Sequence, residues 1–192
     1  MHYVSHPDWP RVEEIAEQLV ARLKQQGISA MVIPEGGYSE AVLPGILTLA
    51  ADLQRNGKEL GVEFQDIWTD SGTGISAIGL LLGMRLLGIT KPRVHITHIA
   101  GNPDEFQQRY VQFERWLEQL TQQPLPGARP QARFIQPATA APYGSANQTI
   151  LRESGAIPRE TALWMNRVYS AKHFYTVKRE MERKAREGPH LI

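Results

Sequence analysis

Apolar and polar positions alternate along this chain with two different periods, which predicts that helices and strands follow one another. Apolar residues three and four apart predict helices over Val12–Leu23, Val42–Leu53, Ser76–Leu87 and Asn102–Leu120. Short apolar runs predict strands at Ser29–Ile33, Phe64–Thr69, Arg93–Ile99 and Ala132–Ile135. Later in the chain, the pattern predicts a short helix over Ala146–Gly155, a helical turn at Glu160–Trp164 and a long helix over Ser170–Arg186.

Turn and cap residues mark the ends of several of these segments. Gly27 is placed to end the first helix and Asn56-Gly57 to end the second, while Pro44 is tolerated because it falls near a helix start. Asn102 is followed by a proline and two acidic residues, the sequence of a well-capped helix N-terminus. The last helix is followed by a Gly-Pro breaker and then by His190–Ile192, where a final strand is expected to begin.

Strands separated by helices predict parallel pairing through right-handed crossovers. We therefore expect an α/β fold with an open, mostly parallel sheet and helices on both faces, forming a single domain over residues 1–192. Ligands bind such sheets beyond the C-terminal ends of the strands. Two glycine turns, Gly36-Gly37 and Gly72-Thr73-Gly74, follow predicted strands and are expected to flank one pocket at that rim.

Composition narrows the function without identifying it. The 192 residues are 42% hydrophobic, and 21 basic against 20 acidic residues leave a net charge of +1. This balance gives no reason to expect nucleic acid or a membrane as a partner. The absence of cysteine excludes disulfides and thiolate chemistry. No leader or membrane-spanning run is found, so a cytoplasmic location is expected.

The segment between the Phe64–Thr69 strand and the next helix has the composition of an anion-binding loop. It reads Ser71, Gly72, Thr73, Gly74, Ile75 and Ser76. Glycines leave backbone N–H groups accessible at the helix start, where the helix dipole favours a phosphate. A tight turn without a ligand is the alternative interpretation. A dinucleotide-binding site is disfavoured because the third glycine of that motif and an acidic residue about 20 positions later are missing.

Other residues that suggest chemistry have simpler explanations. His95 and His98 lie three apart on a predicted strand and so face opposite sides, and no metal site is predicted. The basic run Arg183–Arg186 is interpreted as a solvated helix end. The tryptophans lack the spacing of a stacking surface and are assigned to packing: Trp9, Trp68, Trp116 and Trp164.

Four blocks in order resemble the 1-aminocyclopropane-1-carboxylate deaminase and D-cysteine desulfhydrase family. They are Ile33–Gly37, Asp70–Leu80, Tyr143-Gly144 and Val168–Lys172. This family consists of pyridoxal-phosphate enzymes with the tryptophan-synthase-β-like fold (fold type II). The resemblance maps this chain onto the later part of the family sequence, in the large domain.

The resemblance implies a role for each matched block. Ser71–Ser76 corresponds to the family's phosphate loop, with Ile75 in place of a glycine. Tyr143 and Tyr169 correspond to tyrosines in the family's catalytic site, and Ser170 stands where the deaminases carry an acidic residue. The lysine that binds the cofactor covalently lies in an earlier family segment, in a smaller domain, and Lys172 does not match it. The chain is therefore expected to be a fragment that also lacks the family's final strand.

Two functions from different classes remain open. The first is a pyridoxal-phosphate-dependent lyase or deaminase that acts on a small amino acid, catalysing deamination or β-elimination, and is inactive without the missing lysine. The second is a non-catalytic remnant or a binding partner in a split enzyme. A homodimer, or a complementing chain that supplies the N-terminal segment, is the expected assembly.

Overall fold

The computed structural model describes residues 3–184 and 190–191, which divide into two compact units, Met1–Ser39 and Glu40–Ile192. The first unit contains a short 3-10 helix, His6–Arg11, followed by α1, Val12–Gln25, and a one-turn 3-10 helix, Glu35–Gly37. The helix predicted over Val12–Leu23 is confirmed as α1, and Gly27 with φ 75° follows its end. The single-domain organisation predicted from the sequence stays a prediction.

The strand predicted at Ser29–Ile33 is wrong. This segment is extended but pairs with no strand among the described residues, and Met31 is 80% exposed. Apolar composition alone cannot form a strand, because a strand needs a neighbour for its backbone hydrogen bonds. Gly36-Gly37 therefore does not follow a strand, and the prediction that it shares a sheet rim with Gly72–Gly74 loses its basis.

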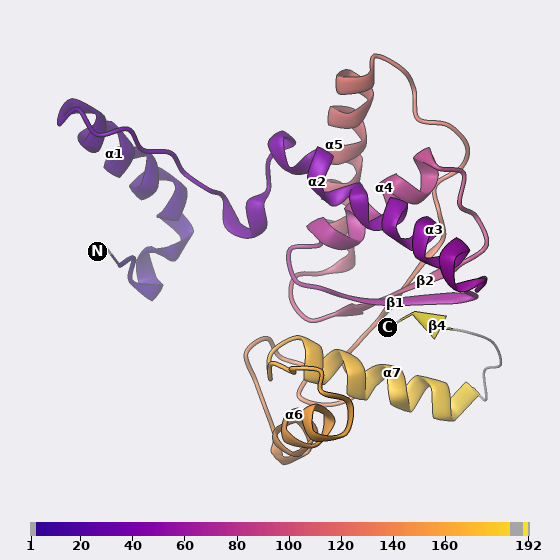
Figure 1. Cartoon of the computed structure of the whole chain (residues 1–192). Coiled ribbons are helices and arrows are strands. Elements are labelled where there is room, and N and C mark those ends of the chain that lie inside the picture. The colour runs from indigo at the N-terminus through magenta and orange to yellow at the C-terminus, as the bar shows by residue number, and fades with distance from the viewer. Residues whose placement is uncertain (1–2, 185–189, 192) are drawn as a thin grey trace. The chain divides into compact units, whose positions relative to one another are not determined.

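The second unit is built on a parallel sheet of four strands in the order β3-β2-β1-β4 (Figure 1). The strands are β1 Asp66–Ser71, β2 Arg93–His98, β3 Ala132–Ile135 and β4 His190–Leu191. Along the β1–β2 pair the register runs from Asp66 opposite Arg93 to Ser71 opposite His98. The predicted parallel α/β sheet is confirmed, although β1 begins two residues later than expected.

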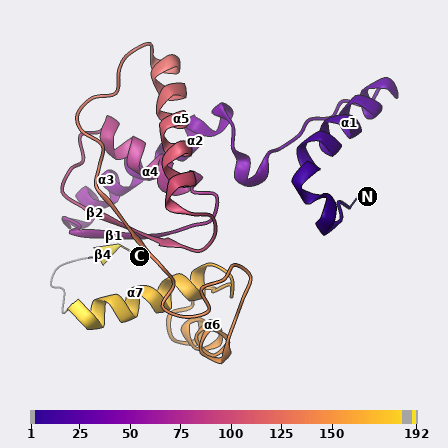
Figure 2. The ribbon, with the colours of Figure 1, turned by 180° about the vertical axis from the view of Figure 1, so that it is seen from behind.

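Helices cover both faces of this sheet, as Figures 1 and 2 show from opposite sides. One face carries α2 Leu43–Ile46, α3 Thr48–Leu60, α4 Ile75–Leu86 and α5 Pro103–Thr121. The opposite face carries α7 Ser170–Lys184, against which α6 Gln148–Thr161 packs. Trp68 and Ile135 of the sheet pack on Val177 and Met181 of α7.

The first face is held by close helix packing. α4 has buried residues over almost its whole length, and its two internal glycines permit the close approach of the preceding helices. A Cβ at Gly79 would collide with Ile46, and one at Gly83 would come within 2.7 Å of the Ala50 Cβ. The sequence predicted one helix over Val42–Leu53. In the structure this segment forms two helices, α2 and α3, which meet at Leu47.

Several helix ends also differ from the expected ones. α3 runs past Asn56-Gly57 to Leu60 and ends at Gly61, whose φ of 64° suits glycine. α6 continues through Pro158 to Thr161 instead of ending near Gly155. The expected extension of α7 beyond Lys184 lies outside the described residues.

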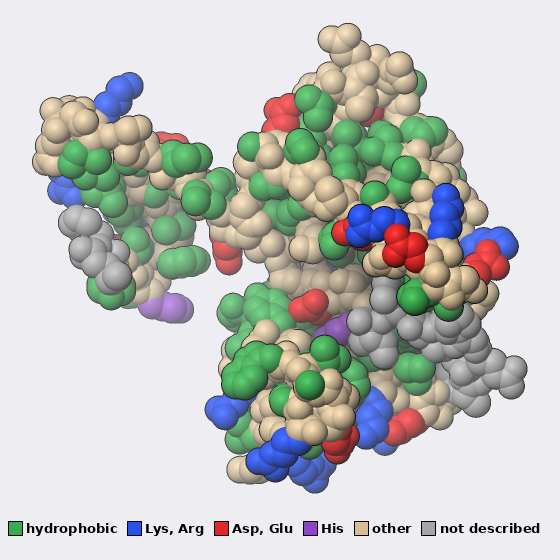
Figure 3. All heavy atoms as spheres, viewed as in Figure 1, with side chains coloured by type: hydrophobic (Ala, Val, Ile, Leu, Met, Phe, Trp, Pro, Cys, Tyr) green, Lys and Arg blue, Asp and Glu red, His purple; other side chains and the backbone are tan. Residues whose placement is uncertain are grey.

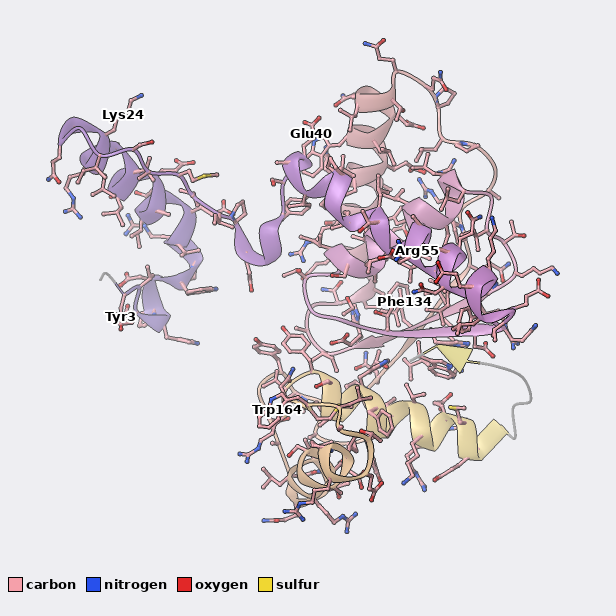
Figure 4. All side chains as sticks on the ribbon, viewed as in Figure 1. Tyr3, Lys24, Glu40, Arg55, Phe134 and Trp164 are labelled. Atoms are coloured by element: carbon pink, nitrogen blue, oxygen red, sulfur yellow. The ribbon has the colours of Figure 1, made fainter. Side chains whose placement is uncertain are left out.

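Charged residues on the surface are of mixed sign. Figure 3 shows basic and acidic side chains beside one another near α3, where Arg55 pairs with Asp52 at 2.7 Å and Lys91 with Glu63 at 2.5 Å. Trp164, labelled in Figure 4, is 89% exposed, so its assignment to packing is wrong. Within residues 3–184 and 190–191, no helix combines the length and apolar character needed to cross a bilayer.

Candidate functional site

The loop between β1 and α4 leads into the N-terminus of α4. Gly74 is the N-cap residue and adopts φ 89°, a conformation that favours glycine, and no side chain caps the helix. The first helical hydrogen bond runs from the Ile78 N–H to the Gly74 carbonyl at 2.8 Å. The amides before Ile78 are the ones that a helix leaves without an internal acceptor.

The two ends of the predicted loop differ in their surroundings. Ser71, the last residue of β1, is 3% exposed, and its Oγ has no hydrogen-bond partner among the residues that the structure describes. Ile75 is also buried, so the bulk that replaces a glycine packs in the core. Ser76 is exposed and borders a groove of 270 Å³ between α3, α4 and β1, together with Thr69 and Asn56.

Tyr169 brings the third motif block to this loop. Its ring lies against Gly72, because a Cβ built at residue 72 would be 2.8 Å from the Tyr169 hydroxyl. Its place at the start of α7 is fixed by Asn166, whose side-chain oxygen accepts the N–H groups of Val168 at 3.0 Å and Tyr169 at 2.7 Å. Ser170 Oγ accepts the Asn166 N–H at 2.8 Å in return, an arrangement equivalent to a capping box.

Tyr143 completes the cluster. Its ring meets that of Tyr169 edge-on, with centroids 6.0 Å apart, and its side chain is largely exposed. The three predicted parts of the site, the loop and the two tyrosines, are thus connected through Tyr169. The contacts join segments that are far apart in the sequence.

A buried lysine holds the turn that carries Tyr143. Lys172 is 0% exposed, and its Nζ donates to the Pro142 carbonyl at 2.9 Å and lies 3.5 Å from Ser145 Oγ. Ser145 Oγ lies 2.7 Å from the Ala140 carbonyl and 2.6 Å from the Pro142 carbonyl, so its single O–H can donate to either within the turn. Burial lowers the pKa of Lys172, since it disfavours the charged ammonium. The sequence signal for this residue was that Lys172 ends the matched block Val168–Lys172.

Helix α5 approaches the loop through two side chains that the sequence analysis did not select. Arg109 Nη1 donates to the Thr73 carbonyl at 2.6 Å. Phe106 packs against Gly74, where a Cβ would come within 2.8 Å of the phenyl ring. The loop therefore has α5 residues and Tyr169, the residue just before α7, as neighbours.

Other buried polar groups serve the sheet and its helices. His173 on α7 bonds through Nδ1 to Thr97 Oγ1 at 2.8 Å, and burial lowers its pKa, against the opposing effect of Asp70. His95 stacks on Trp68 on the α7 face, whereas His98 meets Phe134 of β3, labelled in Figure 4, on the other face. The predicted opposite orientation of His95 and His98 is confirmed. Within the described part of the chain, no three metal-binding side chains cluster.

A buried charge cluster joins α4 and α5 to the segment before β3. Glu114 of α5 pairs with Arg85 and Arg129, and Arg85 also donates to the carbonyls of Leu125 at 3.1 Å and Pro126 at 2.9 Å. Burial opposes ionisation of Glu114, but the two arginines outweigh it and lower the carboxyl pKa. This cluster connects α4, α5 and the segment before β3, and it contains no residue of the predicted site.

Comparison with known proteins supports the same fold and family resemblance. No protein-family model matches the chain. It is 29% identical over 72 residues to "Putative 1-aminocyclopropane-1-carboxylate deaminase" of Pyrococcus furiosus, a match covering 38% of this chain and 22% of that protein. The crystal structure of an ACC deaminase homologue superposes with a TM-score of 0.73 and 21% identity.

The structural match covers 99% of this chain and 55% of the crystallised one. This chain therefore spans about half the length of the solved homologue, and its fold is that of an ACC deaminase homologue. The resemblance to ACC deaminases that the sequence analysis predicted is confirmed by these matches. What the whole homologue does is not transferred with the fold.

Proposed function

We propose that this chain is the cofactor-binding part of a pyridoxal-phosphate-dependent lyase or deaminase that acts on a small amino acid. The observation that carries this proposal is the meeting of three separate motif segments at one place. Tyr169 contacts Gly72 of the loop and the ring of Tyr143, so residues selected from sequence alone lie together. The similarity in sequence and fold to ACC deaminase homologues supports the choice of cofactor.

The donor set at the loop fits a phosphate. Within the described part of the chain, the α4 N-terminus has no side-chain cap and the buried Ser71 Oγ has no partner, so both have hydrogen bonds left to make. Backbone amides at a helix N-terminus and hydroxyl groups are the donors that phosphates commonly receive. The proposed phosphate ligands are Ser71, Gly72, Thr73, Gly74, Ile75 and Ser76, through backbone amides and the hydroxyls of Ser71, Thr73 and Ser76.

The two tyrosines are proposed to face the substrate. When bound, pyridoxal phosphate supplies an electron-accepting ring next to the amino acid's α-carbon. A phenol can both donate and accept a hydrogen bond, so the Tyr169 and Tyr143 hydroxyls can orient a substrate or hold a proton. Lys172 fixes the Tyr143 turn, and Asn166 fixes Tyr169.

Ser170 directs the choice of reaction. Its hydroxyl accepts the Asn166 N–H at 2.8 Å and it supplies no carboxylate at the start of α7. We therefore propose deamination or β-elimination of the D-cysteine desulfhydrase type as the first activity to assay, ahead of cyclopropane ring opening. The chain by itself is proposed to be inactive, because Lys172, the lysine of the matched block, does not correspond to the family's cofactor-binding lysine. The Lys172 Nζ is also buried and bonded to the Pro142 carbonyl.

Binding of pyridoxal phosphate to the purified chain tests this function. We expect reversible binding that inorganic phosphate displaces and that borohydride does not convert into a covalent adduct. The double variant Thr73→Val, Ser76→Val should lose this binding, because it removes two proposed hydroxyl donors. The control Thr90→Val changes an exposed threonine outside the loop and should bind normally.

Two outcomes would contradict the proposal. Equal affinity of the loop variant and the control would exclude the loop as the phosphate site. A borohydride-stable adduct on a lysine would refute the proposed inactivity. Restored turnover after mixing with a separate chain would favour the split-enzyme alternative over a lone catalyst.

A further inference from the structure

We propose that Arg109 is a positioning residue for the phosphate loop. It would hold the Thr73–Gly74 peptide so that the Gly74 N–H faces the bound anion, and bring a positive charge to the loop. This inference rests on the proposed function and extends it to a residue outside all four matched sequence blocks.

The contact between α5 and the loop is direct and double. Arg109 Nη1 donates to the Thr73 carbonyl at 2.6 Å, and the Phe106 ring packs on Gly74. Phe106 and Arg109 are three residues apart on α5, a spacing that puts both side chains on the same side of a helix. One side of α5 therefore contacts two consecutive loop residues: Arg109 contacts Thr73, and Phe106 contacts Gly74.

Peptide geometry turns this contact into an orientation of the next amide. In a trans peptide the carbonyl and the following N–H point in opposite directions, and the described residues contain no cis peptide. Since the Thr73 carbonyl points to Arg109 of α5, the Gly74 N–H points away from α5. Tyr169, the residue just before α7, contacts the neighbouring Gly72, and α7 covers the opposite face of the sheet (Figures 1 and 2). The proposal is that the Gly74 amide, pointing away from Arg109, faces an anion bound on the Tyr169 side of the loop.

The start of α5 holds Arg109 in place. Asn102 caps this helix by accepting the Glu105 N–H at 2.9 Å, and its own amide donates to the Glu105 carboxylate at 2.8 Å. A guanidinium stays charged at all ordinary pH values, and its hydrogen bonds are stronger than those of neutral groups. Its charge adds to the dipole of α4 at the loop, so both favour a phosphate.

Two substitutions on α5 test this role. Arg109→Met removes the charge and the hydrogen bond but keeps a long side chain, and Arg115→Met removes an exposed charge from the same helix as the control. We expect Arg109→Met to weaken pyridoxal phosphate binding by about tenfold or more, the effect of one lost charge-assisted hydrogen bond. Arg115→Met should bind like the wild type. Competition by inorganic phosphate should weaken in parallel for Arg109→Met.

Pyridoxal without its phosphate provides the second measurement. Its binding should be equal in all variants, because Arg109 acts only through the phosphate loop; a general loss of structure would lower both affinities. If Arg109→Met does not fold, the pair Arg109→Lys and Arg115→Lys replaces it, with weaker phosphate binding expected only for Arg109→Lys. Unchanged pyridoxal phosphate affinity in the Arg109 variants would overturn this inference and leave the proposed function standing. Absence of phosphate-competed binding in the wild type would instead overturn both.

Discussion

Replacing Gly72 by alanine tests whether the loop touches Tyr169 as the structure places it. The new Cβ would lie 2.8 Å from the Tyr169 hydroxyl and 3.0 Å from its ring Cε1, whereas ordinary contacts lie at 3.4–4 Å. The ring would have to withdraw by about 0.5 Å or more. Overpacking of this kind costs about 1–3 kcal/mol, and the half-buried position of Tyr169 places the cost near the lower end.

A double-mutant cycle with Tyr169→Ala isolates this cost. Gly72 is not among the described residues with positive φ, so alanine adds no backbone strain there. Without the tyrosine ring, Gly72→Ala should be neutral or stabilise the protein by about 0.4–1 kcal/mol, because it restricts the unfolded chain. The expected coupling free energy between the two positions is about 1–3 kcal/mol.

Urea unfolding measures the four free energies of unfolding that this cycle needs. Tryptophan fluorescence is a suitable signal, since Trp68 is buried between the sheet and α7 and becomes exposed on unfolding. The slope of the free energy with urea should stay constant across the four proteins. Equal destabilisation by Gly72→Ala with and without the tyrosine ring would refute the contact, and with it the convergence on which the proposed site depends.

Two further predictions concern helix packing and pH. Gly83→Ala should destabilise the protein by about 1–2 kcal/mol, because its Cβ would crowd Ala50. Gly155→Ala, whose Cβ meets open space in α6, should stabilise it by about 0.5–1 kcal/mol. Urea unfolding measures both, and a stabilising effect of Gly83→Ala would contradict the packing between α3 and α4. Burial lowers the pKa of His173 from 6.5, so the unfolded chain binds a proton first and the free energy of unfolding should fall as pH drops below about 6.5. His173→Gln should reduce this slope, which cannot exceed about 1.4 kcal/mol per pH unit for one group, while the control His6→Gln should leave it unchanged.

Local sequence was sufficient where the chemistry is local. Asn102 with its proline and acids predicted the start of α5, and the structure has the cap bond from Glu105 to Asn102. Strand Ala132–Ile135 and the helix after the glycine loop were also predicted, the helix within one residue. The grouping of Tyr143, Tyr169 and the loop came from the order of the motif blocks, and the structure brings them into contact.

Sequence failed where a tertiary partner decides the outcome. Ser29–Ile33 has the apolar composition of a strand but no neighbouring strand to bond with among the described residues. Trp164 was assigned to packing from its residue type alone, yet no core forms around it. In the sequence, Arg109 lies outside the matched blocks, and Lys172 lies in a matched block without an assigned role. Their roles depend on carbonyls of Thr73 and Pro142, which only the folded chain places within reach.

The loop contacts both helical layers of the second unit, α5 through Arg109 and the start of α7 through Tyr169. A bound phosphate would therefore link these two layers, and its binding would slow the local opening of both helices. The same linkage works in reverse. A substitution far out along α5 or α7 that loosens its layer would weaken cofactor retention without touching the cofactor.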